Sequence, residues 1–206
     1  MHDLKILMSG TTTVGLVCAD GIILGSDRRA TMGFIVAHPH VKKIYQLDDH
    51  IAATIAGVVA DAQQVMDIAK ANIKLYKYTR NRPINVKAVA SLVSNFLISA
   101  KVMPIQLLIG GYDYTGPRLF ALDPFGTITE EKYMATGSGT PMAVSILEDA
   151  FSRKMLVKDA VNVVSRAIAS AIKRDPASGG GFDLAIITKE KYQEMSSEEI
   201  CEKNII

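Results

Sequence analysis

The opening part of the chain alternates short apolar runs, rich in β-branched residues, with turn residues such as Asp20-Gly21 and Asp48-Asp49. This pattern is typical of consecutive strands joined by tight turns. The strands that it predicts cover residues 12–19, 21–26, 42–47 and 51–56. The chain is therefore expected to begin with a block of strands.

After Gly57 the apolar residues recur three and four positions apart, which is the spacing of an amphipathic helix. This spacing covers residues 62–76 and, beyond Pro83, residues 86–100. Further strands are predicted at 105–109, 118–122, 132–136 and 182–188, and further helices at 143–150 and 157–171. Blocks of strands alternating with helix pairs favour an α+β fold, with sheets in the middle and helices outside, over strict βαβ alternation.

The length of 206 residues, with 49% hydrophobic and 21% charged, fits one globular domain with a sizeable buried core. We find no linker and no internal repeat in the sequence. The tail from Ser196 is typical of a short helix with a serine cap before Glu198 and Glu199. Because such a helix is marginal alone, we expect the tail to dock on a neighbour.

The charge and cysteine pattern excludes several classes of protein. A formal net charge of +2 without a run of five like charges is not the electrostatic footprint of a nucleic-acid binder. Cys18 and Cys201 are far apart and form no CxxC pair, which suits a reducing cytosol. Residues 1–10 lack the apolar core of a signal peptide, and no apolar stretch reaches the length of a membrane span. The sequence predicts a soluble cytoplasmic protein that binds neither nucleic acid nor membrane.

Common catalytic signatures are missing from the sequence. It contains no GxSxG, no Walker phosphate loop, no HExxH and no GxGxxG that opens a helix. His38 and His40 flank Pro39 and could hold a metal, but no third ligand is near them in sequence, so a solvated loop is the simpler interpretation. No metal and no cofactor are expected.

The remaining candidate chemistry begins at three threonines in the run Gly10-Thr11-Thr12-Thr13-Val14-Gly15. By itself, a threonine run that starts a strand is ordinary β-propensity. Other polar and glycine motifs stand at the ends of predicted elements: Asp27-Arg28-Arg29, Lys42-Lys43, Thr54-Ile55-Ala56-Gly57, Thr136-Gly137-Ser138-Gly139 and Arg174-Asp175-Pro176-Ala177-Ser178-Gly179-Gly180. Each has a structural explanation when taken alone: a surface ion pair of Asp27 with Lys43, a turn at Gly57, a helix cap at Ser138, and a helix stop at 178–180.

As an ordered set, these motifs resemble those of the archaeal-type proteasome β subunits, which are N-terminal-nucleophile hydrolases. The resemblance runs from Thr11 to Thr188, and its most specific segments are TTTVG, SDRRAT, TIAG before DAQ, ATGSG and RDPASGG. It implies a four-layer αββα sandwich in which two antiparallel sheets lie between helix layers. The predicted blocks of strands and helices fit that fold without establishing it.

The resemblance also implies a self-processing threonine peptidase. Cleavage between Gly10 and Thr11 would remove residues 1–10 as a propeptide and leave 11–206 as one peptidase domain, with the Thr11 hydroxyl as nucleophile and its freed amine as base. By the same resemblance, Lys43 stabilises the alkoxide and the neutral amine, Asp27 holds Lys43, and the Gly57 N–H faces the oxyanion. Ser138, Asp175 and Ser178 form the supporting shell around the amine.

The substrate and the partners follow from the same resemblance. Substrate backbone is expected along Thr31 and Val59, and the residues of the specificity pocket are Ala30, Val41, Tyr45, Ile55 and Val59. Because none of these carries a charge, we expect cleavage after apolar residues of unfolded polypeptides. The implied partners are α subunits and other β subunits in stacked heptameric rings, with an ATP-dependent unfoldase acting through the α ring.

Two other functions compete with this hypothesis. A structural β subunit that contributes only ring contacts predicts a damaged set of catalytic residues, whereas Thr11, Asp27 and Lys43 are all present. An intact site can still require a partner subunit before it processes itself. An amidase of the same class that acts on small molecules is disfavoured by the RDPASGG and TIAG motifs.

Overall fold

The structure is a computed structural model that describes residues 10–33, 35–57, 59–100 and 105–202. One sheet has the strand order β10-β1-β2-β11-β12, and the other has the order β5-β6-β7-β8-β9. The first contains β1 (Thr12–Val17), β2 (Gly21–Asp27), β10 (Tyr133–Gly137), β11 (Phe182–Thr188) and β12 (Tyr192–Ser196). The second contains β5 (Ile44–Asp48), β6 (Ile51–Gly57), β7 (Ile105–Asp113), β8 (Gly116–Leu122) and β9 (Ile128–Glu131). Neighbouring strands pair antiparallel throughout both sheets.

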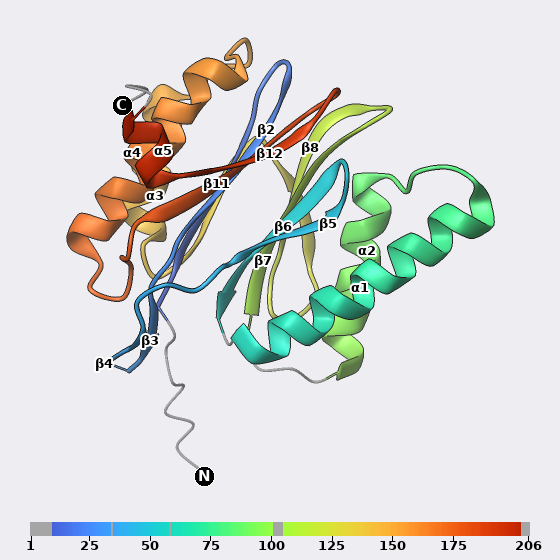
Figure 1. Cartoon of the computed structure of the whole chain (residues 1–206), viewed down its shortest axis with the longest axis horizontal. Coiled ribbons are helices and arrows are strands. Elements are labelled where there is room, and N and C mark those ends of the chain that lie inside the picture. Colours follow the sequence, from blue (N-terminus) through green and yellow to red (C-terminus); the bar gives the residue numbers. More distant parts are fainter. Residues whose placement is uncertain (1–9, 34, 58, 101–104, 203–206) are drawn as a thin grey trace.

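Helices cover the outer face of each sheet, as Figure 1 shows. One helix layer contains α1 (Val59–Arg80) and α2 (Val86–Ala100), and the other contains α3 (Thr140–Ala150), α4 (Val157–Arg174) and α5 (Ser197–Glu202). A separate hairpin of β3 (Ala30–Met32) and β4 (Ile35–His38) extends from one end of the sandwich. The predicted α+β fold with two antiparallel sheets between helix layers is confirmed.

The core has three apolar layers because each sheet is covered on both faces. Strand β2 is buried at every residue, and its side chains alternate between two clusters. Ile23 packs in the cluster beneath α3 and α4, whereas Ile22 and Leu24 pack in the cluster between the sheets. A third cluster lies between the other sheet and helices α1 and α2. Period-two alternation thus fills two layers from one apolar strand.

The strongest sequence patterns gave the correct elements. The predicted apolar face of 157–171 is the buried face of α4, and β11 covers the predicted residues 182–188. The prediction missed β9, β12 and the β3–β4 hairpin. These strands have mainly polar or exposed residues, since the pairing of their backbones forms them without a buried apolar face.

The tail forms helix α5, and its cap is the one that the sequence predicts. The Ser196 N–H donates to Glu199 Oε2 at 2.9 Å, and the Glu199 N–H donates to Ser196 Oγ at 3.2 Å, which is a capping box. Ile200 of this helix is fully buried in the chain's own cluster beneath α3 and α4. Docking of the tail on a neighbour stays a prediction.

Candidate active site

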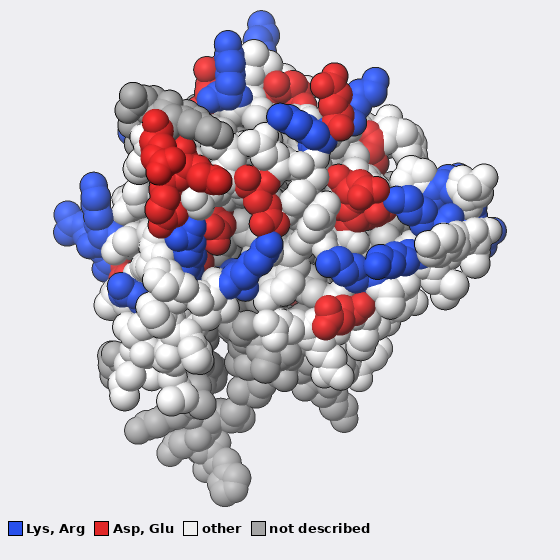
Figure 2. Space-filling view, viewed as in Figure 1, with Lys and Arg blue, Asp and Glu red and all other residues white. Residues whose placement is uncertain are grey.

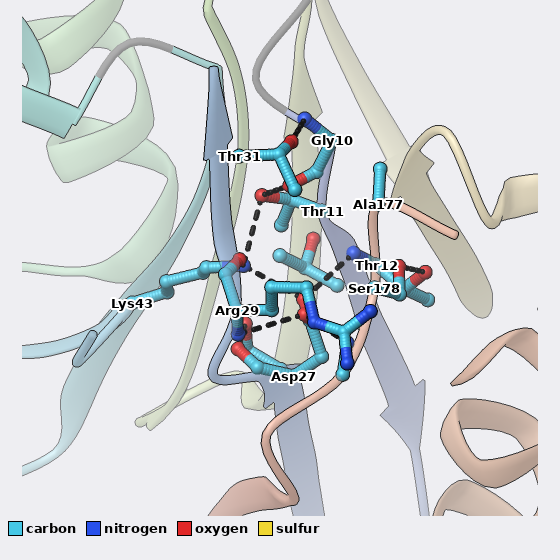
Figure 3. Close-up of polar contacts among 12 residues, drawn as sticks. Gly10, Thr11, Thr12, Asp27, Arg29, Thr31, Lys43, Ala177 and Ser178 are labelled. Atoms are coloured by element: carbon cyan, nitrogen blue, oxygen red, sulfur yellow. Dashed lines mark hydrogen bonds and ion pairs between the residues drawn. The ribbon is translucent and has the colours of Figure 1, made fainter. Parts of the chain in front are cut away.

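Polar residues from distant parts of the sequence meet at one end of the sandwich, beside the start of β1 (Figure 3). Thr11 immediately precedes β1, Asp27 ends β2, and Lys43 immediately precedes β5. The segment 175–179 follows α4 and lies against them. The site therefore joins residues from both sheets.

The hydroxyl of Thr11 lies between a carbonyl group and an ammonium group. Thr11 Oγ1 donates to the Gly10 carbonyl oxygen at 2.7 Å and accepts a hydrogen bond from Lys43 Nζ at 2.9 Å. Thr11 is only 1% exposed. A potential nucleophile is thus held, away from bulk water, next to the peptide bond that precedes it.

The ammonium of Lys43 has an acceptor for each of its three N–H groups. Besides Thr11 it donates to Asp27 Oδ1 at 2.8 Å and to the Arg29 carbonyl oxygen at 2.6 Å. Burial lowers the pKa of Lys43, and the attraction of Asp27 opposes that shift. The side chains of Lys43 and Asp27 are 1% and 0% exposed. The interpretation of these two residues as a surface ion pair is therefore wrong.

The carboxylate of Asp27 is surrounded by donors. Apart from Lys43, it accepts the backbone N–H groups of Thr12 at 2.9 Å, Arg29 at 3.0 Å and Gly179 at 2.9 Å. An ionised carboxylate only accepts hydrogen bonds, so this arrangement suits its charged form. Asp27 thereby ties β1 and the 175–179 segment to the lysine.

A second network leads to the backbone nitrogen of Thr11. The Thr11 N–H donates to Ser138 Oγ at 3.2 Å, and Ser138 Oγ donates to Asp175 Oδ2 at 2.5 Å. Ser178 Oγ donates to the same carboxylate oxygen at 2.6 Å. The interpretation of Ser138 as a helix cap is wrong, because Gly139 occupies the N-cap of α3 and makes no side-chain cap. Helix α4 stops at a C-cap on Asp175, before 178–180.

Comparison with known proteins assigns the chain to a family. Residues 7–187 match the family described as proteasome subunit. The chain belongs to the proteasome subunit family. It is 48% identical to proteasome subunit beta 2 of Aeropyrum pernix, over 93% of this chain and 88% of that protein. It is 46% identical to proteasome subunit beta of Methanosarcina mazei, over 94% and 93%, and 44% identical to that of Methanothermobacter thermautotrophicus, over 100% and 98%.

This proteasome subunit has two further residues at the site that sequence reasoning missed. Thr12 Oγ1 pairs with Ser178 Oγ at 2.7 Å. The guanidinium of Arg29 donates to the Pro176 carbonyl at 2.9 Å and lies against Gly179, where a Cβ would collide with it. Both residues stand in motifs that the sequence shows, Thr12 in TTTVG and Arg29 in SDRRAT, but neither motif indicates these contacts.

The predicted substrate-binding residues of the proteasome subunit lie in several environments. Those with described side chains have buried or half-buried positions and no charge: Ala30, Thr31, Val41, Tyr45 and Ile55. Thr31 Oγ1 reaches Gly10 and accepts its N–H at 3.0 Å. Tyr45 and Ile55 pack with the cluster beneath α1 and α2. Val59 begins α1, but its side chain lies outside the described residues.

Gly57 ends β6 with a φ of 130°, a backbone conformation that favours glycine. His38 and His40 are both exposed. Among the described residues, no group of three or more His, Cys, Asp or Glu side chains could hold a metal ion.

Within the residues that the structure describes, no helix has the length and apolar character needed to cross a membrane. The predicted leader residues 1–9 lie outside the described residues.

Proposed function

We propose that this chain is a catalytic β subunit of the proteasome core particle, a threonine-type endopeptidase that acts on unfolded polypeptides. The observation that carries the proposal is the Thr11 hydroxyl, buried between the Gly10 carbonyl and the Lys43 ammonium. The family match and the β-type relatives support it.

The first reaction is the cleavage of the chain before Thr11. Thr11 Oγ1 attacks the Gly10 carbonyl carbon, and its proton passes to the Thr11 amide nitrogen as the C–N bond breaks. Water then hydrolyses the resulting ester, which leaves a carboxyl group on Gly10 and a free amine on Thr11. Residues 1–10 are the leader that is lost, and 11–206 are the peptidase domain.

The second reaction uses the freed amine as a general base toward its own hydroxyl. A free α-amine has a pKa of about 7.7 to 8.0 and is largely protonated at neutral pH. The positive charge of Lys43 disfavours that second charge and stabilises the alkoxide. Ser138, Asp175 and Ser178 orient the amine, since Ser138 already contacts the same nitrogen.

The tetrahedral oxyanion is stabilised by the Gly57 N–H and by the positive end of α1, which begins at Val59. One such donor typically contributes about 100- to 1,000-fold to the rate. Collapse of this intermediate gives an ester between substrate and Thr11, with the peptide amine leaving. Water hydrolyses the ester and restores the threonine.

The substrate backbone runs along Thr31 and Val59. The side chain of the substrate residue before the scissile bond enters the pocket formed by Ala30, Val41, Tyr45, Ile55 and Val59. The uncharged lining favours cleavage after apolar residues. Fluorogenic peptides with apolar, basic or acidic residues before the scissile bond test this, and faster cleavage of either charged class would reject the apolar preference.

The partners that follow from family membership are other proteasome subunits. We propose assembly with α subunits and with further β subunits in stacked heptameric rings, which an ATP-dependent unfoldase supplies through the α ring. The β-type relatives support this proposal.

The decisive experiment measures intact mass and peptidase activity of the wild-type chain and its Thr11→Ala variant after assembly with α subunits. The wild type is expected to lose residues 1–10 and cleave peptides, and Thr11→Ala is expected to do neither. Thr129→Ala, on exposed strand β9, is the matched control and should behave as wild type. A wild-type chain that keeps its leader and remains inactive would be a structural subunit.

A further inference from the structure

Gly10, the residue before the proposed nucleophile, is held at both ends of its backbone. Its N–H donates to Thr31 Oγ1 at 3.0 Å, and its carbonyl oxygen accepts the Thr11 hydroxyl at 2.7 Å. The residue itself is buried. Residue 10 therefore has a fixed position relative to the surrounding side chains.

The space beside Gly10 is filled by Ala177. A Cβ added at Gly10 would overlap the Cβ of Ala177. It would also lie 3.0 Å from Ala177 Cα and 3.1 Å from Ser138 Oγ. The severe overlap is with the methyl group of Ala177. The other two contacts are milder, and shifts of a few tenths of an ångström would relieve them.

Ala177 cannot move away without breaking contacts of the site. Its own N–H donates to Asp175 Oδ1 at 3.1 Å. On one side of it, the Pro176 carbonyl accepts from Arg29, and on the other, the Gly179 N–H donates to Asp27. The segment that carries the methyl group is thus tied to the same carboxylate that holds Lys43.

We infer that Ala177 is a specificity-determining residue for cleavage of the chain before Thr11: its methyl group restricts the residue that precedes the nucleophile to glycine. Any side chain at position 10 displaces the Gly10 carbonyl from the Thr11 hydroxyl, because both Thr31 and Ala177 constrain the backbone. The inference rests on the proposed self-cleavage and assigns its selectivity to one neighbouring residue.

The test is a size-compensation experiment on the full chain. After mixing with α subunits, the loss of residues 1–10 is monitored by measuring intact mass. Gly10→Ala is expected to slow the loss of the leader by at least about tenfold, because overlap with a packed neighbour raises the barrier. Gly10→Ala combined with Ala177→Gly is expected to recover most of the rate, to within about threefold of wild type. The matched control combines Gly10→Ala with Ala19→Gly, an exposed turn position, and is expected to remain slow.

Each outcome decides for or against the inference. A Gly10→Ala chain that matures at the wild-type rate rejects it, and so does a double variant that stays as slow as Gly10→Ala. Failure of Ala177→Gly alone to mature also rejects it, because residue 177 would then act on more than the size of residue 10. A wild-type chain that never loses its leader instead rejects the proposed function itself, so the two failures are distinguishable.

Discussion

Lys43 is the residue on which most of the electrostatics of the site depends. A buried ammonium loses several kcal/mol of hydration, and here a hydroxyl, a carboxylate and a carbonyl oxygen replace the lost water. Asp27 offsets the burial of the charge, and its backbone donors hold that carboxylate in place. This ion pair thereby positions the ammonium that donates to the Thr11 hydroxyl.

Adjacent lysines offer a matched test of that dependence. Lys43→Met removes the buried ammonium and leaves Asp27 without its counter-ion, whereas Lys42 is an exposed residue paired with Glu194. We expect Lys43→Met to lower both leader removal and peptidase activity at least about 100-fold. Lys42→Met should change both by less than about threefold, since exposed pairs contribute little. Equal effects of the two substitutions, measured by intact mass and peptide hydrolysis, would contradict the assigned role.

The pKa of Lys43 predicts opposite pH trends for activity and stability. Burial lowers this pKa below the ordinary value of 10.5. In the proposed mechanism the ammonium is the form that stabilises the alkoxide, so the rate of leader removal should fall as pH rises through the lowered pKa. Between that lowered pKa and 10.5, Lys43 binds more protons in the unfolded chain than in the folded chain. The free energy of unfolding that Lys43 contributes therefore increases with pH in this range. Cleavage rates and urea unfolding, each compared with Lys43→Met, measure the two trends.

The candidate site was predictable only where a residue stands in a recognisable motif. Thr11, Asp27 and Lys43 stand in such motifs, and the structure brings them together. The contact of Thr12 with Ser178 joins positions 166 residues apart, and nothing in a strand-forming threonine predicts that pairing. Ala177 carries no functional group, so only the space around Gly10 reveals it.

At the scale of elements, a buried apolar face made the secondary structure predictable. Helix α4 and strand β11 have such faces, and their positions follow from periodicity. Strands β9 and β12 lie at the edges of their sheets, with little apolar burial, and form by pairing with β8 and β11. A pattern of side chains alone carries no information about such backbone pairing.

The capping box of Ser196 and Glu199 stabilises the start of helix α5. Ser196→Ala removes the acceptor of the Glu199 N–H and is expected to lower the free energy of unfolding by about 0.5 to 2 kcal/mol. Ser91→Ala is the matched control, because Ser91 is an exposed serine within α2 whose hydroxyl bonds the Lys87 carbonyl. That control should stay within about 0.5 kcal/mol of wild type in urea unfolding. A Ser196→Ala chain as stable as the control contradicts the role of the cap.

At the scale of the whole molecule, the two sheets approach closely where glycines replace side chains. A Cβ at Gly15 on β1 would lie 2.7 Å from Leu119 Cδ1 of the opposite sheet. A Cβ at Gly110 on β7 would lie 2.7 Å from Ile22 Cδ1 and 3.0 Å from Leu24 Cδ2. These two glycines therefore allow the close approach of the sheets.

Gly110→Val is expected to destabilise the protein by overpacking this layer. The added side chain meets Ile22 and Leu24, which are fully buried, and the expected loss is about 1 to 3 kcal/mol. Thr129→Val, on exposed strand β9, adds an apolar β-branched residue without such contacts and should change the free energy of unfolding by less than about 0.5 kcal/mol. Denaturant unfolding of both variants measures the difference, and equal stability would rule out a tightly packed layer.

The site takes Thr11 and Asp27 from one sheet and Lys43 from the start of the other, so neither sheet alone contains it. Under the proposed chemistry, a chain that has folded only halfway has no means of cutting itself. Loss of the leader is then an irreversible record that both halves have docked correctly. Under that proposal, the breaking of one covalent bond reports that both sheets have docked, and the peptidase stays inactive until then.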